Sequence, residues 1–227
     1  MIPIRDTLPA RRPAWVMWFL ILLNGLGFAA EIHAGPLIEH FVSRYAVVPA
    51  DWLVGSSSDF FDWPHLFLTL ITCQFLHANW FHLLSNMLYL WIFGNNVEDR
   101  LGHFRFLLLY LGCGAIAGVA QIVVTPRSFV PMVGASGAIA GVLGAYFLLF
   151  PTARVVTLIP LGLWWETIEI PAFIFLGIWF FLQWASGLSS IGQVSEAGGV
   201  AFWAHIGGFV SGMIGSVILL PRSARRA

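Results

Sequence analysis

A serine and a histidine, far apart in the chain, are the two residues best suited to covalent chemistry. Ser136 lies in the glycine-rich run GASGAIAG, residues 134–141, and His205 lies in AHIGGFVSG, residues 204–212. A serine hydroxyl is a weak nucleophile until a neighbouring base takes its proton, and a neutral imidazole can do this near physiological pH. The pair therefore predicts hydrolysis with Ser136 as the nucleophile and His205 as the general base.

A second group of polar residues could supply the donors that such a reaction needs. The segment HANWFHLLSN, residues 77–86, places His82 and Asn86 four residues apart, on one face of a helix. The supporting residues that we expect around them are His77, Gly134, Gly137 and Gly208. A tetrahedral intermediate needs hydrogen-bond donors for its oxyanion, so we predict an oxyanion site formed by His82, Asn86 and the backbone N–H of Ser136.

Other hydrolytic mechanisms fit the sequence less well. No acidic residue lies in the two helices expected to carry Ser136 and His205, so we predict a dyad without a third triad member. The chain has no HExxH pattern for a zinc protease and no pair of membrane-buried aspartates for an aspartyl protease. A metal site formed by His77, His82 and His205 is an alternative, although no carboxylate or thiolate accompanies them in the membrane. We therefore expect neither a metal nor another cofactor.

The elements that must position these residues are membrane helices. Of 227 residues, 59% are hydrophobic and only 10% are charged, which is more apolar surface than a soluble domain of this size can bury. A spanning helix needs about 20 mostly apolar residues. Six runs approach this length: 14–33, 79–97, 103–124, 136–150, 168–186 and 201–220. The sequence therefore predicts an all-α polytopic membrane protein, with a long outer loop between its first two helices.

The arginines predict the orientation of this bundle. With both termini inside, nine of the eleven arginines lie on the inner side, and only Arg44 and Arg127 lie outside. We expect a cytoplasmic tail over 1–13, a six-helix membrane domain over 14–220 and a basic cytoplasmic tail over 221–227. The first helix follows a basic, proline-containing start, so a cleaved signal peptide is an alternative, although its apolar stretch is long for one.

Stripes of small residues explain how the reacting groups could meet. Gly137 and Gly141 are spaced by four residues in the fourth helix, and Gly208 and Gly212 have the same spacing in the sixth. This pattern lets helix backbones approach closely. The second, fourth and sixth helices all run from outside to inside and carry their polar clusters near their starts. We therefore expect the three clusters to lie together, in a water-filled cavity below the outer surface.

Two connecting segments could border that cavity. The segment 34–78 combines aromatic residues with polar residues and prolines, and we expect it to be interfacial and partly helical. The loop 187–200 is rich in Gly and Ser, as a movable cover over a site would be, and an ordinary flexible connector is the alternative.

Four motifs occur in an order and spacing that are highly specific. They are HANWFHLLSN (77–86), Gly94 with Glu98 and Gly102, GASGAIAG (134–141) and AHIGGFVSG (204–212). Over roughly residues 60–215 the chain resembles the rhomboid family of intramembrane serine proteases. The resemblance implies a six-transmembrane-helix rhomboid-like bundle that keeps its first helix.

The resemblance also implies roles for individual residues. It assigns Ser136 as nucleophile, His205 as base, and His82 and Asn86 to the oxyanion site. It gives Glu98 a structural role and makes the 187–200 loop the cap above the site. The substrates it implies are single-pass membrane proteins, cut near the outer end of a helix that small or helix-breaking residues have weakened.

Two departures from the family pattern affect what surrounds the site. The family often has a Trp-Arg pair in the first outer loop, where this chain reads Trp63-Pro64-His65, so an arginine that braces the loop is missing. Many members carry an aromatic residue four positions after the serine, where this chain has Ala140. We expect another group, such as an aromatic from a different helix, to hold His205.

The function that we predict is that of an active intramembrane serine endopeptidase. A non-cleaving rhomboid-like protein that binds client helices is the alternative, and a small transporter fits less well because the polar clusters gather on one side. The expected partners are single-pass transmembrane substrates and the lipid bilayer. Nucleic acid is not expected, because the net charge is zero. Because we find no transit-peptide pattern, we expect the protein in a prokaryotic plasma (inner) membrane.

Overall fold

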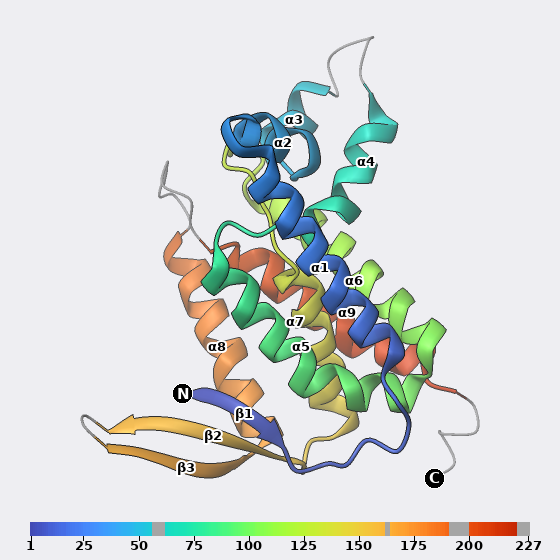
Figure 1. The fold of residues 1–227 in the computed structure, drawn as a ribbon, viewed down its shortest axis with the longest axis vertical. Coiled ribbons are helices and arrows are strands. Elements are labelled where there is room, and N and C mark those ends of the chain that lie inside the picture. Colours follow the sequence, from blue (N-terminus) through green and yellow to red (C-terminus); the bar gives the residue numbers. More distant parts are fainter. Residues whose placement is uncertain (56–61, 162–163, 191–199, 222–227) are drawn as a thin grey trace.

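The fold is a helical bundle with a small sheet at one end, and the computed structural model describes residues 1–55, 62–161, 164–190 and 200–221. The helices are α1 (Trp15–Ala34), α2 (Ile38–Tyr45), α3 (Pro49–Gly55), α4 (Trp63–Thr72), α5 (Trp80–Leu101), α6 (His103–Val124), α7 (Ser136–Leu149), α8 (Ala172–Ser190) and α9 (Phe202–Leu219). The strands are β1 (Ile2–Asp6), β2 (Arg154–Leu161) and β3 (Trp164–Pro171). Figure 1 shows the sheet at one end of the bundle, which we call the sheet end, and α2, α3 and α4 at the other.

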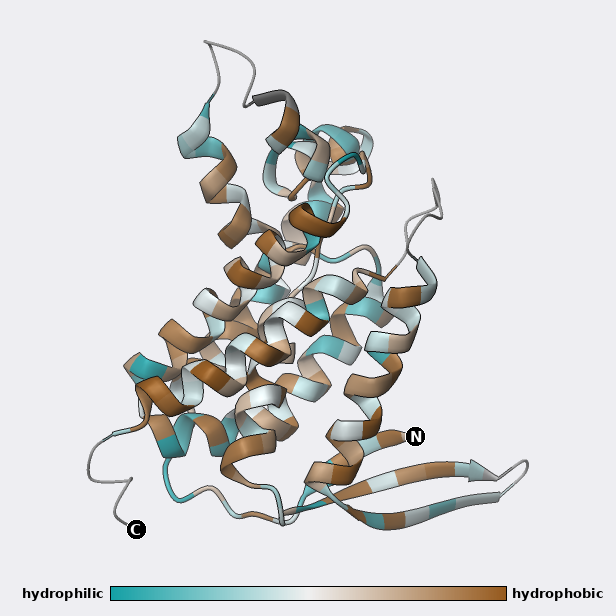
Figure 2. Cartoon of the chain, turned by 180° about the vertical axis from the view of Figure 1, so that it is seen from behind, coloured by the Kyte–Doolittle hydropathy of each residue, from teal (hydrophilic) through white to brown (hydrophobic). Residues whose placement is uncertain are grey.

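Several of these helices have the length and composition of membrane spans. Within the described part of the chain, four meet both criteria for crossing a bilayer: the continuous run Trp15–Tyr45, α6, α8 and α9. Helix α7 is apolar but shorter, and α5 is long but carries many polar residues in its second half. Figure 2 shows hydrophobic residues all along the bundle helices, and many large hydrophobic side chains of α1, α6, α8 and α9 are exposed, as expected where lipid replaces water. The chain is therefore a multi-pass helical membrane protein, and all six predicted segments contain a helix.

The three-stranded sheet contradicts the expectation of an all-α protein. The strands pair antiparallel in the order β1-β2-β3, so the predicted tail 1–13 and the predicted inner loop 151–167 are joined in one sheet. Strand β2 reads RVVTLIPL, and its β-branched residues favour extended backbone. The fifth helix begins at Ala172, later than the predicted 168, because β3 occupies the residues before it.

Helix α7 lies in the centre of the bundle, packed against α5, α6, α8 and α9. Every residue from 137 to 146 is buried. A side chain at Gly208 would collide with the backbone carbonyl of Gly137, and one at Gly212 would collide with that of Gly141. The backbones of α7 and α9 therefore touch, which is the close approach that the two small-residue stripes predict.

The two connecting segments differ from simple loops where the structure describes them. Most described residues of 34–78 belong to α2, α3, α4 and two short 3₁₀ turns. In the predicted cover 187–200, the first four residues complete α8, and residues 191–199 lie outside the described part of the chain.

A buried carboxylate fixes the start of α1 at the sheet end. Glu98 of α5 is 1% exposed, and its two oxygens accept hydrogen bonds from the backbone N–H groups of Val16 (2.9 Å) and Met17 (2.7 Å). These N–H groups have no partner within the helix, and the positive end of the helix dipole also favours an anion there. His103 Nδ1 lies 2.5 Å from Glu98 Oε1. In this arrangement α1 is part of the bundle, and cleavage after it would remove these contacts.

A second carboxylate joins β1 to the same region. Asp6 accepts a hydrogen bond from Tyr146 Oη at 2.6 Å and another from Asn96 Nδ2. Partial burial raises the pKa of Asp6 above the ordinary value of an aspartate, and the hydrogen bonds from Tyr146 and Asn96 act in the opposite direction. We call Asp6, Asn96, Glu98, His103 and Tyr146 the sheet-end cluster.

Candidate active site

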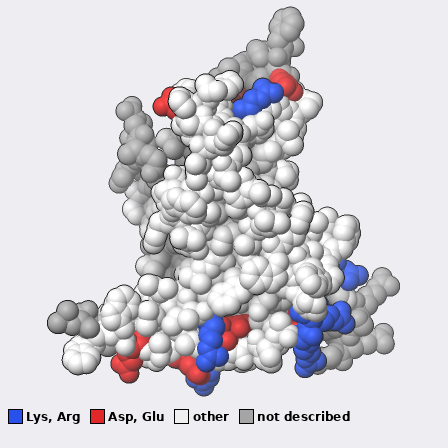
Figure 3. All heavy atoms as spheres, in the orientation of Figure 1, with Lys and Arg blue, Asp and Glu red and all other residues white. Residues whose placement is uncertain are grey.

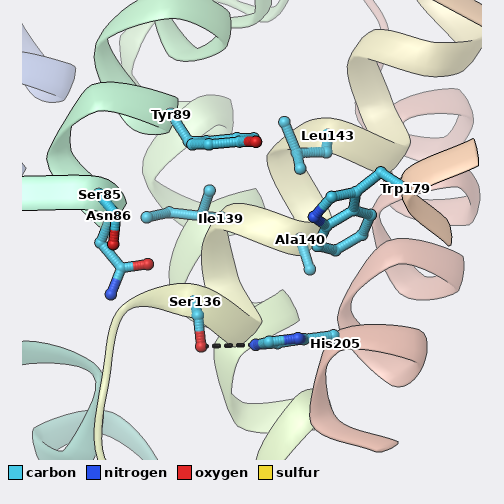
Figure 4. Close-up of a pocket in the computed structure, with 9 residues that line it drawn as sticks. All are labelled: Ser85, Asn86, Tyr89, Ser136, Ile139, Ala140, Leu143, Trp179 and His205. Atoms are coloured by element: carbon cyan, nitrogen blue, oxygen red, sulfur yellow. Dashed lines mark hydrogen bonds between the residues drawn. The ribbon is translucent and has the colours of Figure 1, made fainter. Parts of the chain in front are cut away.

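The structure brings Ser136 and His205 together. Ser136 is the first residue of α7, His205 is in the first turn of α9, and the Oγ of Ser136 lies 2.8 Å from the Nε2 of His205 (Figure 4). The backbone contact between α7 and α9 lies just beyond both residues. A hydroxyl at this distance from an imidazole nitrogen can pass its proton to that nitrogen as it attacks a carbonyl.

The second nitrogen of the imidazole ring contacts a side chain of α8. His205 Nδ1 lies 2.7 Å from the side-chain oxygen Oε1 of Gln183. A carbonyl oxygen only accepts hydrogen bonds, so Nδ1 is the protonated nitrogen of the neutral ring and the lone pair of Nε2 faces Ser136. The ring of Trp179 also lies beside His205, with 5.9 Å between centroids and an interplanar angle of 35°. An aromatic side chain from another helix thus stands where Ala140 provides none.

Sequence reasoning missed Gln183 although a signal for it was present. A polar side chain within an apolar helix that spans a membrane is costly and calls for a partner, and Gln183 lies in the apolar run FFLQW. Unlike Ser136 and His205, Gln183 has no glycine motif beside it, so the sequence pattern assigned it no role.

A pocket of about 170 Å³ opens beside Ser136. Figure 4 shows the α5 residues on one side of it and the α8 and α9 residues on the other. Its lining consists of Ser85, Asn86, Tyr89, Ser136, Ile139, Ala140, Leu143, Trp179 and His205. The walls are mostly apolar and the few polar groups surround the serine, which is the usual composition of a site that binds an apolar chain and acts on one polar group. Ser85 and Tyr89 are lining residues that the sequence did not single out.

Asn86 lines this pocket, and its side-chain amide N–H groups donate no hydrogen bond within the described part of the chain. It is 7% exposed, and its Nδ2 has no hydrogen-bond partner among the described residues. An unpaired buried amide N–H is costly, so it indicates a place where a bound acceptor belongs. This is the property expected of an oxyanion donor.

His82 lies against the loop that leads into Ser136. A side-chain carbon built on Gly134 would come within 2.7 Å of the His82 ring and 3.7 Å of Ser136 Oγ, so the ring and the hydroxyl border the same small space. Gly134 has a φ of 125°, which residues other than glycine avoid. The side chain of Asn79 accepts a hydrogen bond from the His82 N–H at 2.8 Å and caps α5 there.

His77 supports the site without lining the pocket. It is 2% exposed, its ring packs edge-on against that of His82 with 5.1 Å between centroids, and its backbone N–H donates to Glu31 Oε2 at 2.8 Å. Neither ring nitrogen has a hydrogen-bond partner in the described part of the chain. Within the same residues, no group of three or more His, Cys, Asp or Glu side chains is arranged to hold a metal ion.

Aromatic packing occupies the region where the family's bracing arginine is missing. Trp52 of α3 packs edge-on against Trp63 and Phe67 of α4, with centroid distances of 6.3 and 5.3 Å. Asp62 caps α4 by accepting a hydrogen bond from the backbone N–H of His65 at 3.1 Å. The aromatic contacts join α3 to α4, and the cap fixes the start of α4.

The sequence of this chain is similar to those of several known proteins. A Rhomboid domain profile matches residues 64–222. The mitochondrial Rhomboid protein 1 of Saccharomyces cerevisiae is 29% identical over 184 residues, which is 79% of this chain and 46% of that protein. The Rhomboid protease GluP of Bacillus subtilis is 34% identical over 155 residues, which is 68% of this chain and 26% of that protein. The human presenilin-associated rhomboid-like protein, also mitochondrial, is 30% identical over 152 residues, 63% of this chain and 36% of that protein.

These alignments cover less than half the length of each of the three relatives, but the Rhomboid profile covers more than two thirds of this chain and includes the serine, the histidine and the pocket between them. The chain therefore belongs to the rhomboid family.

Proposed function

We propose that this protein is an intramembrane serine endopeptidase that cleaves transmembrane segments by a Ser136–His205 dyad. The observation that carries the proposal is the 2.8 Å contact between Ser136 Oγ and His205 Nε2 beside a mostly apolar pocket, in a bundle whose outer surface is apolar. A hydroxyl-imidazole pair with no hydrolytic role would need neither the pocket nor the unused donor of Asn86.

The reaction follows from the positions of these groups. His205 Nε2 takes the hydroxyl proton while Ser136 Oγ bonds to the carbonyl carbon of the scissile peptide, and the carbonyl oxygen becomes an oxyanion. The Asn86 amide, the His82 ring and the Ser136 N–H at the start of α7 donate hydrogen bonds to that oxyanion. His205 then gives its proton to the departing amine and an acyl-enzyme remains. A water molecule, deprotonated in turn by His205, releases the new carboxyl end and restores the serine.

Gln183 acts in this scheme as a positioning residue. By accepting from Nδ1–H, it fixes the tautomer and the ring orientation that direct Nε2 at Ser136. This is the task of the aspartate in a triad, performed here by a neutral amide. A neutral partner suits an apolar helix, where an unpaired carboxylate would be costly.

The proposed substrates are single-pass membrane proteins in the same bilayer. The pocket is lined by α5 on one side and by α8 and α9 on the other, and its apolar walls suit a peptide that small or helix-breaking residues have partly unwound. From the distribution of arginines we also propose a bundle of six spans with both termini in the cytoplasm. A prokaryotic inner membrane is the proposed location.

The test is cleavage of a model transmembrane substrate in liposomes. Ser136→Ala should lower the cleavage rate by about 10³-fold or more. His205→Ala should have a similar effect, because the two residues act as a unit and the loss of either one removes most of the rate enhancement. Ser211→Ala is a matched control: this serine is on α9, bonded to the carbonyl of Gly208 at 2.8 Å and outside the pocket lining, and the variant should cleave like the wild type.

Two results would contradict the proposal. Cleavage that persists in the purified Ser136→Ala variant would show that another residue is the nucleophile. A wild-type protein that binds the substrate helix but cuts none would favour the non-cleaving alternative.

A further inference from the structure

The hairpin formed by β2 and β3 has a surface that the proteolytic site does not explain. It lies across the sheet end of the bundle, and both Figure 1 and Figure 2 show the end of β2 and the start of β3 extending beyond α8. Three large hydrophobic side chains of β3 are exposed: Trp164 (80%), Trp165 (61%) and Ile168 (39%). Exposed tryptophans at the end of a membrane bundle indicate a contact that the protein alone does not supply.

The strand register separates the hairpin into two faces. Val155 lies opposite Ile170 and Thr157 opposite Ile168, so these four side chains are on one face, which we call the inner face. Val155 and Thr157 are fully buried beneath the bundle, and Ile170 packs against the core. Because side chains alternate along a strand, Trp164 belongs to this same face farther out, where it is 80% exposed. Ile168, opposite the buried Thr157, is 39% exposed and lies at the edge of the covered part.

The opposite face, which we call the outer face, carries Trp165 near the end of the hairpin and polar residues farther along β3. Thr167 and Glu169 lie on it, and Arg154 of β2 reaches Glu169 with 4.0 Å between Nε and Oε2. All three side chains are exposed. In the middle of β3 the two faces therefore differ: Ile168 and Ile170 face the same way as the buried side chains under the bundle, and Thr167 and Glu169 face away from them.

The inner face is continuous with a surface that meets lipid. Helix α8 starts directly after β3 and is one of the helices long and apolar enough to cross a membrane. Its exposed side chains include Phe173, Ile174, Ile178, Phe181 and Leu182. The first of these lies only two residues past the end of β3, so lipid that covers α8 would reach the uncovered inner face of the hairpin.

The charged side chains place the hairpin at headgroup depth. Figure 3 shows the acidic and basic residues of one face in two groups, one at each end of the molecule, separated by a broad uncharged band. The hairpin lies at the level of the lower group. Glu166 shares the inner face with Trp164, and a carboxylate is tolerated among headgroups but not in hydrocarbon. Tryptophan is enriched at this boundary.

We propose that the inner face of the hairpin beyond α8 rests on the lipid headgroup region, with Trp164 and Ile168 directed toward the bilayer and Thr167 and Glu169 directed toward water. The hairpin then acts as a lateral brace for α8. This role is independent of proteolysis.

Paired spin labels on neighbouring positions of β3 test this orientation. Single cysteines at Ile168→Cys and Thr167→Cys point to opposite faces of the same strand, and the two native cysteines, Cys73 and Cys113, are buried. In phosphatidylcholine and phosphatidylglycerol vesicles, we expect the label at 168 to be relaxed by oxygen, which concentrates in lipid. The label at 167 should be relaxed by a water-soluble nickel chelate, to which position 168 is several-fold less accessible.

Reference positions define the two limits. Ile178→Cys on α8 gives the lipid-facing value and Glu39→Cys on α2, an exposed residue at the far end, gives the aqueous value. Equal nickel accessibility at 167 and 168 would overturn the proposal. Protection of position 168 from both reagents would also overturn it, because a protein partner or a second copy would then cover the face.

Discussion

Helix α5 contributes to two buried polar clusters that have opposite character. Asn86, on its first half, lines the pocket beside Ser136, whereas Asn96 and Glu98, on its second half, belong to the sheet-end cluster. The sheet-end cluster contains carboxylates, and its hydrogen bonds join α1, β1, α5 and α7. The second cluster consists of the polar residues that line the pocket beside Ser136. Its lining includes no carboxylate, it surrounds an open volume, and the Nδ2 of Asn86 has no partner among the described residues.

The difference distinguishes buried polar groups that stabilise from those that act. A buried anion is tolerated when every oxygen has a donor, and it then holds together the elements that supply the donors. A neutral donor without a partner stabilises nothing in the free protein, but it is ready for charge that appears only during a reaction. Substitutions at the sheet end should therefore lower stability, and substitutions in the pocket should lower the cleavage rate.

The largest change in stability is expected for substitution of Glu98. Glu98→Ala leaves the two N–H groups at the start of α1 and His103 without their acceptor, so the free energy of unfolding should fall by about 3–5 kcal/mol. Reversible unfolding in mixed micelles measures this loss. Glu39→Ala, at an exposed position on α2, should stay within about 0.5 kcal/mol of the wild type. A stable but inactive Glu98→Ala protein would break the contrast.

Asn86→Ala should show the reverse pattern. Loss of one oxyanion donor should lower kcat by about 10²- to 10³-fold, equivalent to about 2.7–4 kcal/mol of transition-state stabilisation. The free energy of unfolding should hardly change, because Nδ2 has no partner to lose. Cleavage kinetics and unfolding of the same preparation give both numbers. A variant that is destabilised but retains its kcat would place Asn86 with the structural residues.

A smaller effect is expected for Gln183. Gln183→Met removes the acceptor for His205 Nδ1–H while keeping a similar volume, and supporting residues of this kind are worth about 10- to 100-fold in activity. We expect kcat to fall with KM unchanged, and ¹⁵N spectra of His205 to show loss of the single Nδ1–H tautomer. Gln183→Glu keeps an acceptor oxygen and should retain the tautomer. A Met variant with an unchanged tautomer and rate would exclude the positioning role.

The smallest effect concerns the pH dependence contributed by Asp6. Burial raises the pKa of Asp6 in the folded protein, so the folded state holds this proton more tightly than the unfolded state does. The stability due to this group is therefore greatest at low pH and declines as the pH rises through the folded pKa. Asp6→Asn should remain within about 1.5 kcal/mol of the wild type and should lack this decline, as unfolding between about pH 4 and pH 7 would reveal. If the free energies of unfolding of the wild type and of Asp6→Asn changed in parallel with pH, this prediction would be wrong.

The helices and the reacting pair were accessible from the sequence for identifiable reasons. Apolar runs mark membrane helices, and the glycines around Ser136 and His205 mark helices in backbone contact. The sheet was not accessible, since β1 and β2 are about 150 residues apart and the apolar residues of β2 and β3 read equally well as a loop or the start of a helix. The apolar run around Gln183 marks it as a side chain that needs a partner, but only the fold shows that this partner is His205.

The backbone contact between α7 and α9 has a consequence for bilayers of different thickness. A helical bundle adjusts to a thinner or thicker hydrocarbon layer by tilting its helices. Two helices whose glycines touch must tilt as one body, so acyl chain length should not alter the separation of hydroxyl and imidazole. The pocket walls on α5 and α8 meet through side chains such as Phe93 and Phe175, which restrain the two helices less than backbone contact does. Lipid composition would therefore act on which substrates fit and leave the bond-breaking step intact.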